Sequence, residues 1–375
     1  MNKRIFATLS AIGAVLVSSA LQQAPALAKG GNMWVTGYYP GWQQTVKPSD
    51  IDFKVVTHVI YFSLIPKADG SLDATGNGLT DANAEALVAA THKAHRKVLV
   101  SVGGENSGPA FQAAIAPGVR PAFVKNIVDW ATSRHFDGVD IDMEPTKPED
   151  AANFQALVHE VRVGLRASNP DALLTSAVGV TPAIYKPILD DVDQINIMTY
   201  DMSGPWEGWE TWYNSCLDNG GRKFKSVGRP LPSSKQMVAD MIAGGVPASK
   251  IGIGICMYGV AWKGATGPNQ PIDGVTTEGI SYADIMDKYY AKNRYHWDVG
   301  PDAPYLAVDA PNKQDRAFVA YDDARACEAK VSFVRSQHLG GVIIWELAGG
   351  YRSNQPAGQR DTLLKSIGKA VASGK

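Results

Sequence analysis

The sequence predicts an α/β protein, and three observations favour this class. Eight short apolar or β-branched runs follow one another along the chain, most of them separated by stretches of helical periodicity. Runs such as 97–101 and 251–255 are almost continuously apolar, which is typical of a parallel sheet buried on both faces. About 60 residues follow the seventh run, where a few are usual. Eight strand–helix units make a closed barrel, so we predict a (β/α)8 TIM barrel with a small α+β insertion between strand 7 and helix 7.

The elements can be placed in order along the chain. The eight expected strands lie at residues 34–39, 55–65, 97–103, 136–143, 173–180, 194–202, 251–258 and 341–347. The clearest helical periodicity falls at residues 81–96, 121–135, 149–167, 233–244 and 321–338, and the tail after Asp361 is expected to form the closing helix. The insertion, at about residues 260–318, is rich in Gly, Pro and aromatic residues and is expected to form a small subdomain. It would rise from the C-terminal face of the barrel, where barrel enzymes keep their active sites.

Charge and composition exclude several classes of function. The chain has 36 Lys and Arg against 37 Asp and Glu, so it has no net positive charge. Its charge therefore does not predict binding to nucleic acid or to a membrane surface. The 45% of hydrophobic residues and 19% of charged residues exclude a disordered chain. We therefore expect a soluble, folded protein.

The first residues have the pattern of a secretory signal peptide. Two positive charges lie in residues 1–4, an apolar run follows at 5–17, and Ala26-Leu27-Ala28 has the small-x-small pattern of a cleavage site. A membrane anchor would need about 20 continuous apolar residues, and this run is interrupted at Ser18-Ser19. We expect residues 1–28 to be removed and the mature protein, residues 29–375, to be secreted to the extracellular space or the periplasm.

Cysteines and common cofactor motifs give no further site. Cys216, Cys256 and Cys327 allow at most one disulfide and show no metal-ligand spacing. The chain also lacks the HExxH, GxSxG and P-loop motifs, so we expect no bound cofactor and no metal from these patterns.

The most informative segment is the fourth expected strand. Asp140, Asp142 and Glu144 alternate there with apolar residues, so the three acids share one face of the strand. Neighbouring acids on that face are about 7 Å apart at their α-carbons. Burying three ionised carboxylates together would be strongly unfavourable, so either a cation binds there or the acids share protons.

Three interpretations of these acids can be compared. A solvated acidic edge does not fit, because the alternating residues are apolar and the strand is expected in the barrel interior. A Mg²⁺ or Ca²⁺ site fits, because both cations prefer carboxylate ligands. Glycoside hydrolysis also fits, because it needs one acid of raised pKa and a second group beside the developing positive charge. The spacing leaves the last two open.

The spacing also resembles a known signature. Asp137-x-x-Asp140-x-Asp142-x-Glu144 is similar to the DxxDxDxE motif of family 18 glycoside hydrolases, the chitinases, in their secreted bacterial form. Further matching segments fall at the ends of other expected strands: Gly37-Tyr38-Tyr39-Pro40, Ser101-Val102-Gly103-Gly104, Met198-Thr199-Tyr200-Asp201, Tyr258-Gly259 and Gly341-Val342-Ile343-Ile344-Trp345-Glu346. The insertion, followed by Tyr321-Asp322-Asp323, resembles the chitinase insertion domain of this family.

The resemblance implies a substrate-assisted mechanism without a cofactor. Glu144 would be the general acid and then the general base, and the substrate's 2-acetamido oxygen would be the nucleophile that forms an oxazolinium ion. Asp142 would accept the acetamido N–H and share a proton with Asp140 before substrate binds. Tyr200 would donate its hydroxyl to the acetamido oxygen.

The remaining site residues are also implied by the resemblance. Substrate-binding positions would be Tyr38, Met198, Asp201, Tyr258 and Trp345, with Trp345 as the apolar floor under the distorted sugar. Asp137 faces away from the other acids and is expected to hold the strand entry. The implied partner is chitin or chitooligosaccharides, with no nucleic acid, no membrane after signal cleavage, and a monomeric state.

Several positions depart from the family pattern. Glu105 and Pro145 stand where many members carry an aromatic residue, Val260 where an Arg is frequent and Gly350 where an Asp is frequent. Three tryptophans follow strand 6 at a spacing of three residues, namely Trp206, Trp209 and Trp212. They can supply stacking surface for sugar rings or form a packed loop, and the sequence favours neither.

The leading hypothesis is a secreted chitinase that hydrolyses β-1,4 bonds between N-acetylglucosamine units with retention of configuration. An endo-β-N-acetylglucosaminidase acting on N-glycans is the alternative within the same chemistry, and the insertion favours chitinase because it would wall a groove for a linear chain. A non-catalytic chitin-binding lectin on this fold usually lacks the acid residue, and here Glu144 is present. A metal-dependent barrel enzyme remains the chemical competitor.

Overall fold

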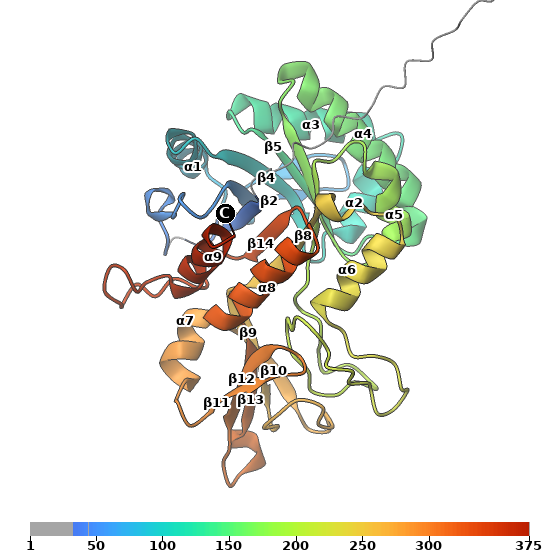
Figure 1. The fold of residues 1–375 in the computed structure, drawn as a ribbon. Coiled ribbons are helices and arrows are strands. Elements are labelled where there is room, and N and C mark those ends of the chain that lie inside the picture. Colours follow the sequence, from blue (N-terminus) through green and yellow to red (C-terminus); the bar gives the residue numbers. More distant parts are fainter. Residues whose placement is uncertain (1–32, 44, 375) are drawn as a thin grey trace, which may run out of the picture. The chain divides into compact units, whose positions relative to one another are not determined.

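Eight parallel strands close into a barrel in the computed structural model, which describes residues 33–43 and 45–374 (Figure 1). The strands are β1 (Trp34–Pro40), β2 (His58–Pro66), β4 (Lys97–Gly104), β5 (Gly138–Met143), β6 (Leu173–Val178), β7 (Gln194–Ile197), β8 (Ile251–Cys256) and β14 (Gly341–Trp345). Strand β1 pairs in parallel with β14 on one side and β2 on the other, and this double pairing closes the sheet. The predicted (β/α)8 barrel is confirmed, whereas the predicted signal peptide lies outside the described residues.

The strands are buried on both faces, which explains their nearly continuous apolar sequences. Every residue of β5 and β8 is buried. Alternate side chains point into the barrel or outward beneath the helices. A residue at the C-terminal end of any of these strands therefore lies at one common edge of the barrel.

Helices on the outside of the barrel cover the strands (Figure 1). They are α1 (Asp81–Lys93), α2 (Gly108–Ala114), α3 (Arg120–Ser133), α4 (Ala151–Ser168), α5 (Pro182–Tyr185), α6 (Ser234–Ala243), α8 (Ala324–Ser336) and α9 (Thr362–Ala372). Side-chain caps mark several N-termini: Thr80, Ser233, Asp323 and Asp361 each accept a hydrogen bond from a backbone N–H in the first turn. Short 3-10 segments lie at Pro48–Asp50, Pro148–Asp150, Lys186–Ile188, Ala248–Lys250 and Lys313–Asp315, and a π segment at Ile285–Tyr289.

The insertion between β8 and α8 forms its own antiparallel sheet. In spatial order its strands are β10 (Thr276–Ser281), β9 (Tyr258–Lys263), β13 (Ala317–Tyr321), β12 (Ala303–Val308) and β11 (Tyr295–Asp298), with the short helix α7 (Tyr282–Asp284) after β10. Trp262 and Phe318 of this sheet pack in one apolar cluster with Trp212, Tyr213 and Phe224 of the β7–α6 connection. The insertion therefore shares a core with the long loop that follows β7.

Several strand boundaries differ from the sequence-based expectation by two residues or more, among them those of the sixth, seventh and second strands. The sixth expected strand ends at Ile197, because the backbone then turns into a loop that carries residues 198–202. The seventh, expected at 251–258, is divided, with β8 in the barrel and β9 starting at Tyr258 in the insertion sheet. The second begins at His58, after a turn over residues 53–55. A two-stranded ladder of β2 with β3 (Leu72–Asp73) is a further addition.

All three cysteines are buried free thiols. Burial raises the pKa of the Cys216, Cys256 and Cys327 thiols.

No helix within residues 33–43 and 45–374 is long and apolar enough to cross a membrane.

Candidate active site

Asp140 lies at the base of the site, fully buried inside the barrel. Three hydroxyls from neighbouring strands donate to its carboxylate: Thr175 Oγ1 at 2.5 Å, Ser101 Oγ at 3.1 Å and the Tyr38 hydroxyl at 3.2 Å. Burial raises the pKa of Asp140 to about 6, while these hydrogen bonds favour its charged form. Asp140 therefore fixes β1, β4 and β6 around the strand that carries the other two acids.

Asp142 and Glu144 form a hydrogen-bonded pair above Asp140. Burial, followed by the charges of Glu144 and Asp140, raises the pKa of Asp142 well above its usual range. Burial also raises the pKa of Glu144 to about 7, with smaller contributions from the charges of Glu105 and Asp201. The pair consequently holds at least one proton near neutral pH, which is the state that a general acid needs.

Asp142 lies beside both Glu144 and Asp140. The charges of both neighbours raise its pKa, and the proton shared between Asp142 and Asp140 that the resemblance implies stays a prediction. Both oxygens of Asp140 accept hydroxyl donors. Asp142 Oδ1 is buried and has no hydrogen-bond partner within the described part of the chain. That oxygen is available for a donor from a ligand.

Two glycines let β4 approach the acid strand closely. Gly103 has φ of +116°, and a Cβ there would lie 1.9 Å from the Asp142 carbonyl oxygen. Gly104 has φ of +110°, and its missing side chain makes room for the Phe62 ring. Any other residue would strain this backbone and push β4 away from Asp142. The glycines of the segment 101–104 thus have a positional role beside the acids.

A cleft of about 540 Å³ opens above the acids. Seven of the nine predicted site residues line it, namely Tyr38, Asp142, Glu144, Met198, Tyr200, Asp201 and Trp345. The other two lie directly behind the lining: Asp140 accepts from the Tyr38 hydroxyl, and Tyr258 donates its hydroxyl to Asp201 at 2.7 Å. The structure therefore brings all nine predicted residues together.

Aromatic rings build the far wall of the cleft. Trp345 packs edge-on against Tyr38 and Phe62, with ring centroids 5.5 and 4.6 Å apart. The Tyr200 ring fits against Gly254, where a Cβ would lie 2.5 Å from it. Burial raises the pKa of Tyr200 well above its usual range, so its hydroxyl stays protonated and can donate.

The cleft also contains residues that sequence reasoning missed. Trp42, 49% exposed, lies at the mouth and packs edge-on against Phe62. Its position two residues after the segment 37–40 was an available signal. Ser107 accepts from the Glu144 N–H and donates to the Asp142 carbonyl, and Thr175 supports Asp140. No sequence pattern marked these hydroxyls, because their partners are distant along the chain.

The three tryptophans after strand 6 have different environments. Trp212 is fully buried and donates its indole N–H to the Pro232 carbonyl at 2.9 Å. Trp209 packs between Trp206 and Phe224, with ring centroids 4.6 and 4.9 Å away. Trp206 is 49% exposed. Trp212 is thus core, and only Trp206 presents a large ring face to solvent.

Asp137 lies at the opposite end of β5 from the cleft. Its carboxylate accepts hydrogen bonds from Lys97 Nζ and the Val98 N–H and contacts His92 Nε2, each at 2.9 Å. These contacts fasten the starts of β4 and β5 together, as expected of a residue that holds the strand entry.

Across the residues that the structure describes, no group of three or more His, Cys, Asp or Glu side chains has an arrangement that could hold a metal ion.

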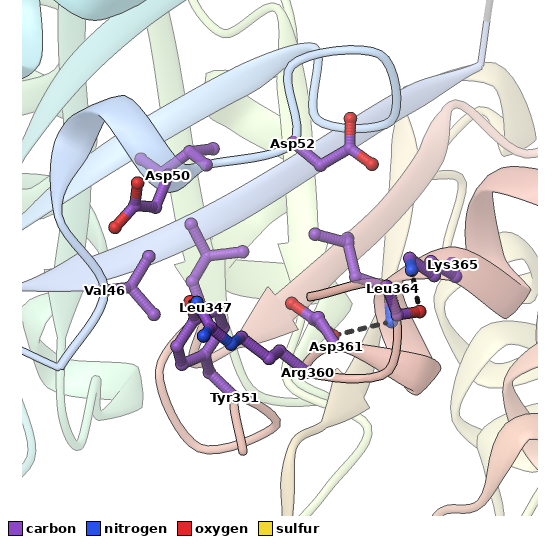
Figure 2. Close-up of a pocket in the computed structure, with 11 residues that line it drawn as sticks. Val46, Asp50, Asp52, Leu347, Tyr351, Arg360, Asp361, Leu364 and Lys365 are labelled. Carbon is purple, nitrogen blue, oxygen red and sulfur yellow. Dashed lines mark hydrogen bonds between the residues drawn. The ribbon is translucent and has the colours of Figure 1, made fainter. Parts of the chain in front are cut away.

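A second cavity, of about 290 Å³, lies between the β1–β2 connection and the start of α9 (Figure 2). Asp361 points into it and accepts from the Leu364 N–H, while Arg360 and Lys365 line the same cavity. None of the predicted site residues lines this cavity. The chemistry described above belongs to the larger cleft.

Comparisons with known proteins find several chitinases to which this chain is similar. Chitinase A1 of Niallia circulans is 32% identical over 68% of this chain, and chitinase B of Serratia marcescens is 26% identical over 70% of it. The matches span 40% and 66% of these relatives, so the chain covers less than two thirds of their length. Catalytic domain 2 of the Ostrinia furnacalis group II chitinase, solved in complex with a chitooligosaccharide, superimposes with a TM-score of 0.76 at 23% identity. That superposition covers 92% of this chain and 97% of the other.

A family model also matches most of the chain. The model of glycosyl hydrolases family 18 matches residues 34–350, which include all eight barrel strands and the insertion. The acid strand, the cleft and the eight-stranded barrel all lie within this range. The chain therefore belongs to glycosyl hydrolases family 18.

Proposed function

We propose that this protein is a chitinase that hydrolyses β-1,4 bonds between N-acetylglucosamine units with retention of configuration. The observation that carries the proposal is the buried pair of Asp142 and Glu144, which holds a proton near neutral pH at the base of an aromatic-walled cleft. The relatives named above are chitinases, and this supports the choice of substrate.

The first step is proton transfer from Glu144 to the glycosidic oxygen. The bond between the anomeric carbon and the glycosidic oxygen then breaks. As it breaks, the acetamido oxygen of the sugar that carries this anomeric carbon bonds to the carbon and gives an oxazolinium ion. The free Asp142 Oδ1 accepts the acetamido N–H, and its negative charge stabilises the cation. Tyr200 donates its hydroxyl to the acetamido oxygen and orients it for attack.

The second step reverses the roles. The Glu144 carboxylate, which has given up its proton, takes one from a water molecule, and the hydroxide attacks the anomeric carbon from the face that the leaving group vacated. The C–O bond to the acetamido oxygen breaks, which restores the acetamido group and leaves the original configuration. Trp345 supports the apolar face of the sugar through both steps.

Replacing Glu144 tests the acid assignment. Glu144→Gln keeps the size and shape of the side chain but cannot donate a carboxylic proton, so turnover of chitooligosaccharides should fall at least 10³-fold while binding is largely retained. Glu149→Gln, an exposed position outside the cleft, is the matched control and should have wild-type activity. Retained turnover in Glu144→Gln would refute this role.

Three further measurements separate the alternatives. A thiazoline analogue of the oxazolinium ion should inhibit competitively, and a lack of inhibition would contradict the participation of the substrate. Loss of activity with a chelator, restored by an added divalent cation, would instead support a metal-dependent enzyme. Incubation with chitin oligomers and with a high-mannose glycoprotein, followed by mass analysis of the products, distinguishes chitinase from an endo-β-N-acetylglucosaminidase acting on N-glycans.

A further inference from the structure

The cleft carries an unusual balance of charge. Four carboxylates line it, from Glu105, Asp142, Glu144 and Asp201, and no Lys, Arg or His is among its described lining residues. The pair of Asp142 and Glu144 holds at least one proton, and Asp201 accepts from the Tyr258 hydroxyl. Glu105 is the lining acid for which the proposed mechanism has no use.

Glu105 is positioned as a free carboxylate on the cleft wall. It directly follows Gly104 at the end of β4, it is exposed, and its carboxylate makes no hydrogen bond or ion pair with any residue in the described ranges. Its negative charge nevertheless acts on Glu144 and on Asp201, and it raises the pKa of both. Glu105 is thus close enough to influence the reacting groups, without a cation of the protein to neutralise it.

A neutral sugar makes little use of such a group. An N-acetylglucosamine unit can offer Glu105 a hydroxyl or an amide N–H, both of which water can replace at an exposed position. A glucosamine unit offers a protonated amine, which forms a charge-assisted hydrogen bond with the carboxylate. A carboxylate without a counter-charge therefore favours a cationic sugar over a neutral one.

The chemistry of the cleft restricts where that cationic sugar can bind. The unit above Asp142 must keep its acetamido group, because the acetamido oxygen is the nucleophile and its N–H is the donor for the free Asp142 oxygen. A glucosamine is acceptable only in a neighbouring position, where its amine takes no part in the reaction. Glu105 lines the cleft directly after β4 and is not one of the groups that hold the acetamido unit, so we assign it to such a neighbouring position.

We propose that Glu105 directs this enzyme towards partially deacetylated chitin, with an N-acetylglucosamine above Asp142 and a protonated glucosamine in the adjacent position beside Glu105. This inference rests on the proposed function, because it needs the substrate-assisted cleavage of an N-acetylglucosamine unit. It adds a substrate class and the residue that selects it.

The test compares two substrates in two variants. For the purified protein, kcat/KM is measured with a fully acetylated chitooligosaccharide and with a partially deacetylated one of the same length. The preference is the value for the partially deacetylated substrate divided by the value for the acetylated one. Glu105→Gln removes the charge with little change in size and should lower this ratio by up to roughly fivefold, the upper end for an exposed ion pair. Glu149→Gln removes an exposed charge outside the cleft and should leave the ratio unchanged.

Two additional readouts connect the effect to charge and to position. The preference of the wild type should weaken as salt is added, because exposed ion pairs are screened. Mass sequencing of products from partially deacetylated chitin should show N-acetylglucosamine on the acetamido side of the cleaved bond and an excess of glucosamine in one neighbouring position, and Glu105→Gln should remove that excess.

The possible failures are distinguishable. If the folded wild type cleaves the acetylated substrate but the ratio is the same in wild type and Glu105→Gln, the role of Glu105 is wrong and the proposed function stands. If the folded wild type cleaves neither substrate, the proposed function fails and this inference fails with it.

Discussion

The Glu144 carboxyl group is where the environment of a single residue matters most. Burial removes water from the charged form, and the nearby charges of Glu105 and Asp201 act in the same direction, whereas the hydrogen bond with Asp142 opposes them. The result is an acid that still holds its proton at a pH where an exposed glutamate has lost it. Burial, the neighbouring Asp142 and two acids that are distant along the sequence thus determine the protonation of Glu144.

This environment predicts the pH dependence of the reaction. Because the pKa of Glu144 is raised to about 7, the proton is present below that pH and lost above it, so kcat/KM should fall tenfold per unit as the pH rises beyond about 7. Glu105→Gln removes a charge that raises this pKa, and the fall should begin at lower pH. The measurement is kcat/KM against pH for both proteins with a fully acetylated substrate. A fall at the same pH in both would contradict the electrostatic influence of Glu105.

At the level of residues, the sequence predicted the acids of the cleft more completely than the side chains that support them. The alternation of Asp140, Asp142 and Glu144 with apolar residues is visible in a single strand, and so is their common face. The hydroxyl of Thr175 and the Trp42 ring belong to other strands or loops and reach the site only through the closure of the barrel. A pattern within one segment carries no information about them.

Among the elements, the junction of β13 with α8 contains a buried ion pair. Lys330 and Asp322 are 1% and 2% exposed, and Lys330 Nζ lies 2.5 Å from Asp322 Oδ2 and 2.6 Å from Ser215 Oγ. Ser215 in turn donates to the Thr199 carbonyl at 2.6 Å, directly before Tyr200. This chain of contacts attaches the loop after β7 to the insertion and to α8.

Removing one member of the pair should be costly. Lys330→Met leaves Asp322 buried without its counter-charge, so the free energy of unfolding should fall by about 3–5 kcal/mol in urea titrations. Lys235→Met, which breaks the exposed pair with Asp218, should cost less than about 1 kcal/mol. The double variant Lys330→Met with Asp322→Leu should regain part of the loss. If Lys330→Met and Lys235→Met lower the free energy of unfolding equally, the buried pair matters no more for stability than the exposed one, which would contradict the prediction.

The cap of α9 offers a second test at this scale. Asp361 accepts from the Leu364 N–H, and burial raises its pKa to about 6 (Figure 2). Because that value lies above the value in the unfolded chain, the folded state favours the protonated form, and Asp361 costs stability as the pH rises from about 4 to 6. Asp361→Asn keeps the cap without the charge, so it should be at least as stable as the wild type at pH 7. Asp361→Ala should lose about 1 kcal/mol of unfolding free energy at pH 4, where the charge is absent.

The elements themselves were largely predictable, because buried parallel strands are nearly continuous apolar runs. All eight barrel strands lie where such runs occur. A strand boundary was mispredicted where an apolar run continues although the strand changes its pairing partner. This happens between Cys256 of β8, which pairs in the barrel, and Tyr258 of β9, which pairs in the insertion sheet. Pairing partners decide those boundaries, and they are not local.

On the scale of the whole molecule, the barrel carries the acids of the cleft and the insertion extends one of its connections. Trp262 and Phe318 share an apolar cluster with Trp212 of the β7–α6 connection, which begins beside Tyr200 and Asp201. The sequence indicated the insertion by the length of one connection and by its aromatic residues. It did not indicate that the loop after β7 would pack against it, because the two segments are separated along the chain.

Secretion is a prediction from the first residues of the sequence. If residues 1–28 are a signal peptide, the protein recovered outside the cytoplasm should begin at Lys29, because signal peptidase cuts after a small-x-small pattern. Intact mass and N-terminal sequencing of protein expressed in a secreting host provide the measurement. A secreted protein that retains Met1, or a product confined to the cytoplasm, would contradict the prediction. Ala28→Lys, which disrupts the small-x-small site, should prevent processing.

The three buried thiols have a practical consequence. A reagent that modifies cysteine can reach Cys216, Cys256 and Cys327 only after the surrounding structure opens, since all three are excluded from solvent. Cys256 ends β8 in the barrel and Cys327 lies in α8, whereas Cys216 belongs to the cluster shared with the insertion. The labelling rate of each cysteine therefore reports the opening of its own region. Comparing the three rates reveals whether the insertion region opens before the barrel or together with it.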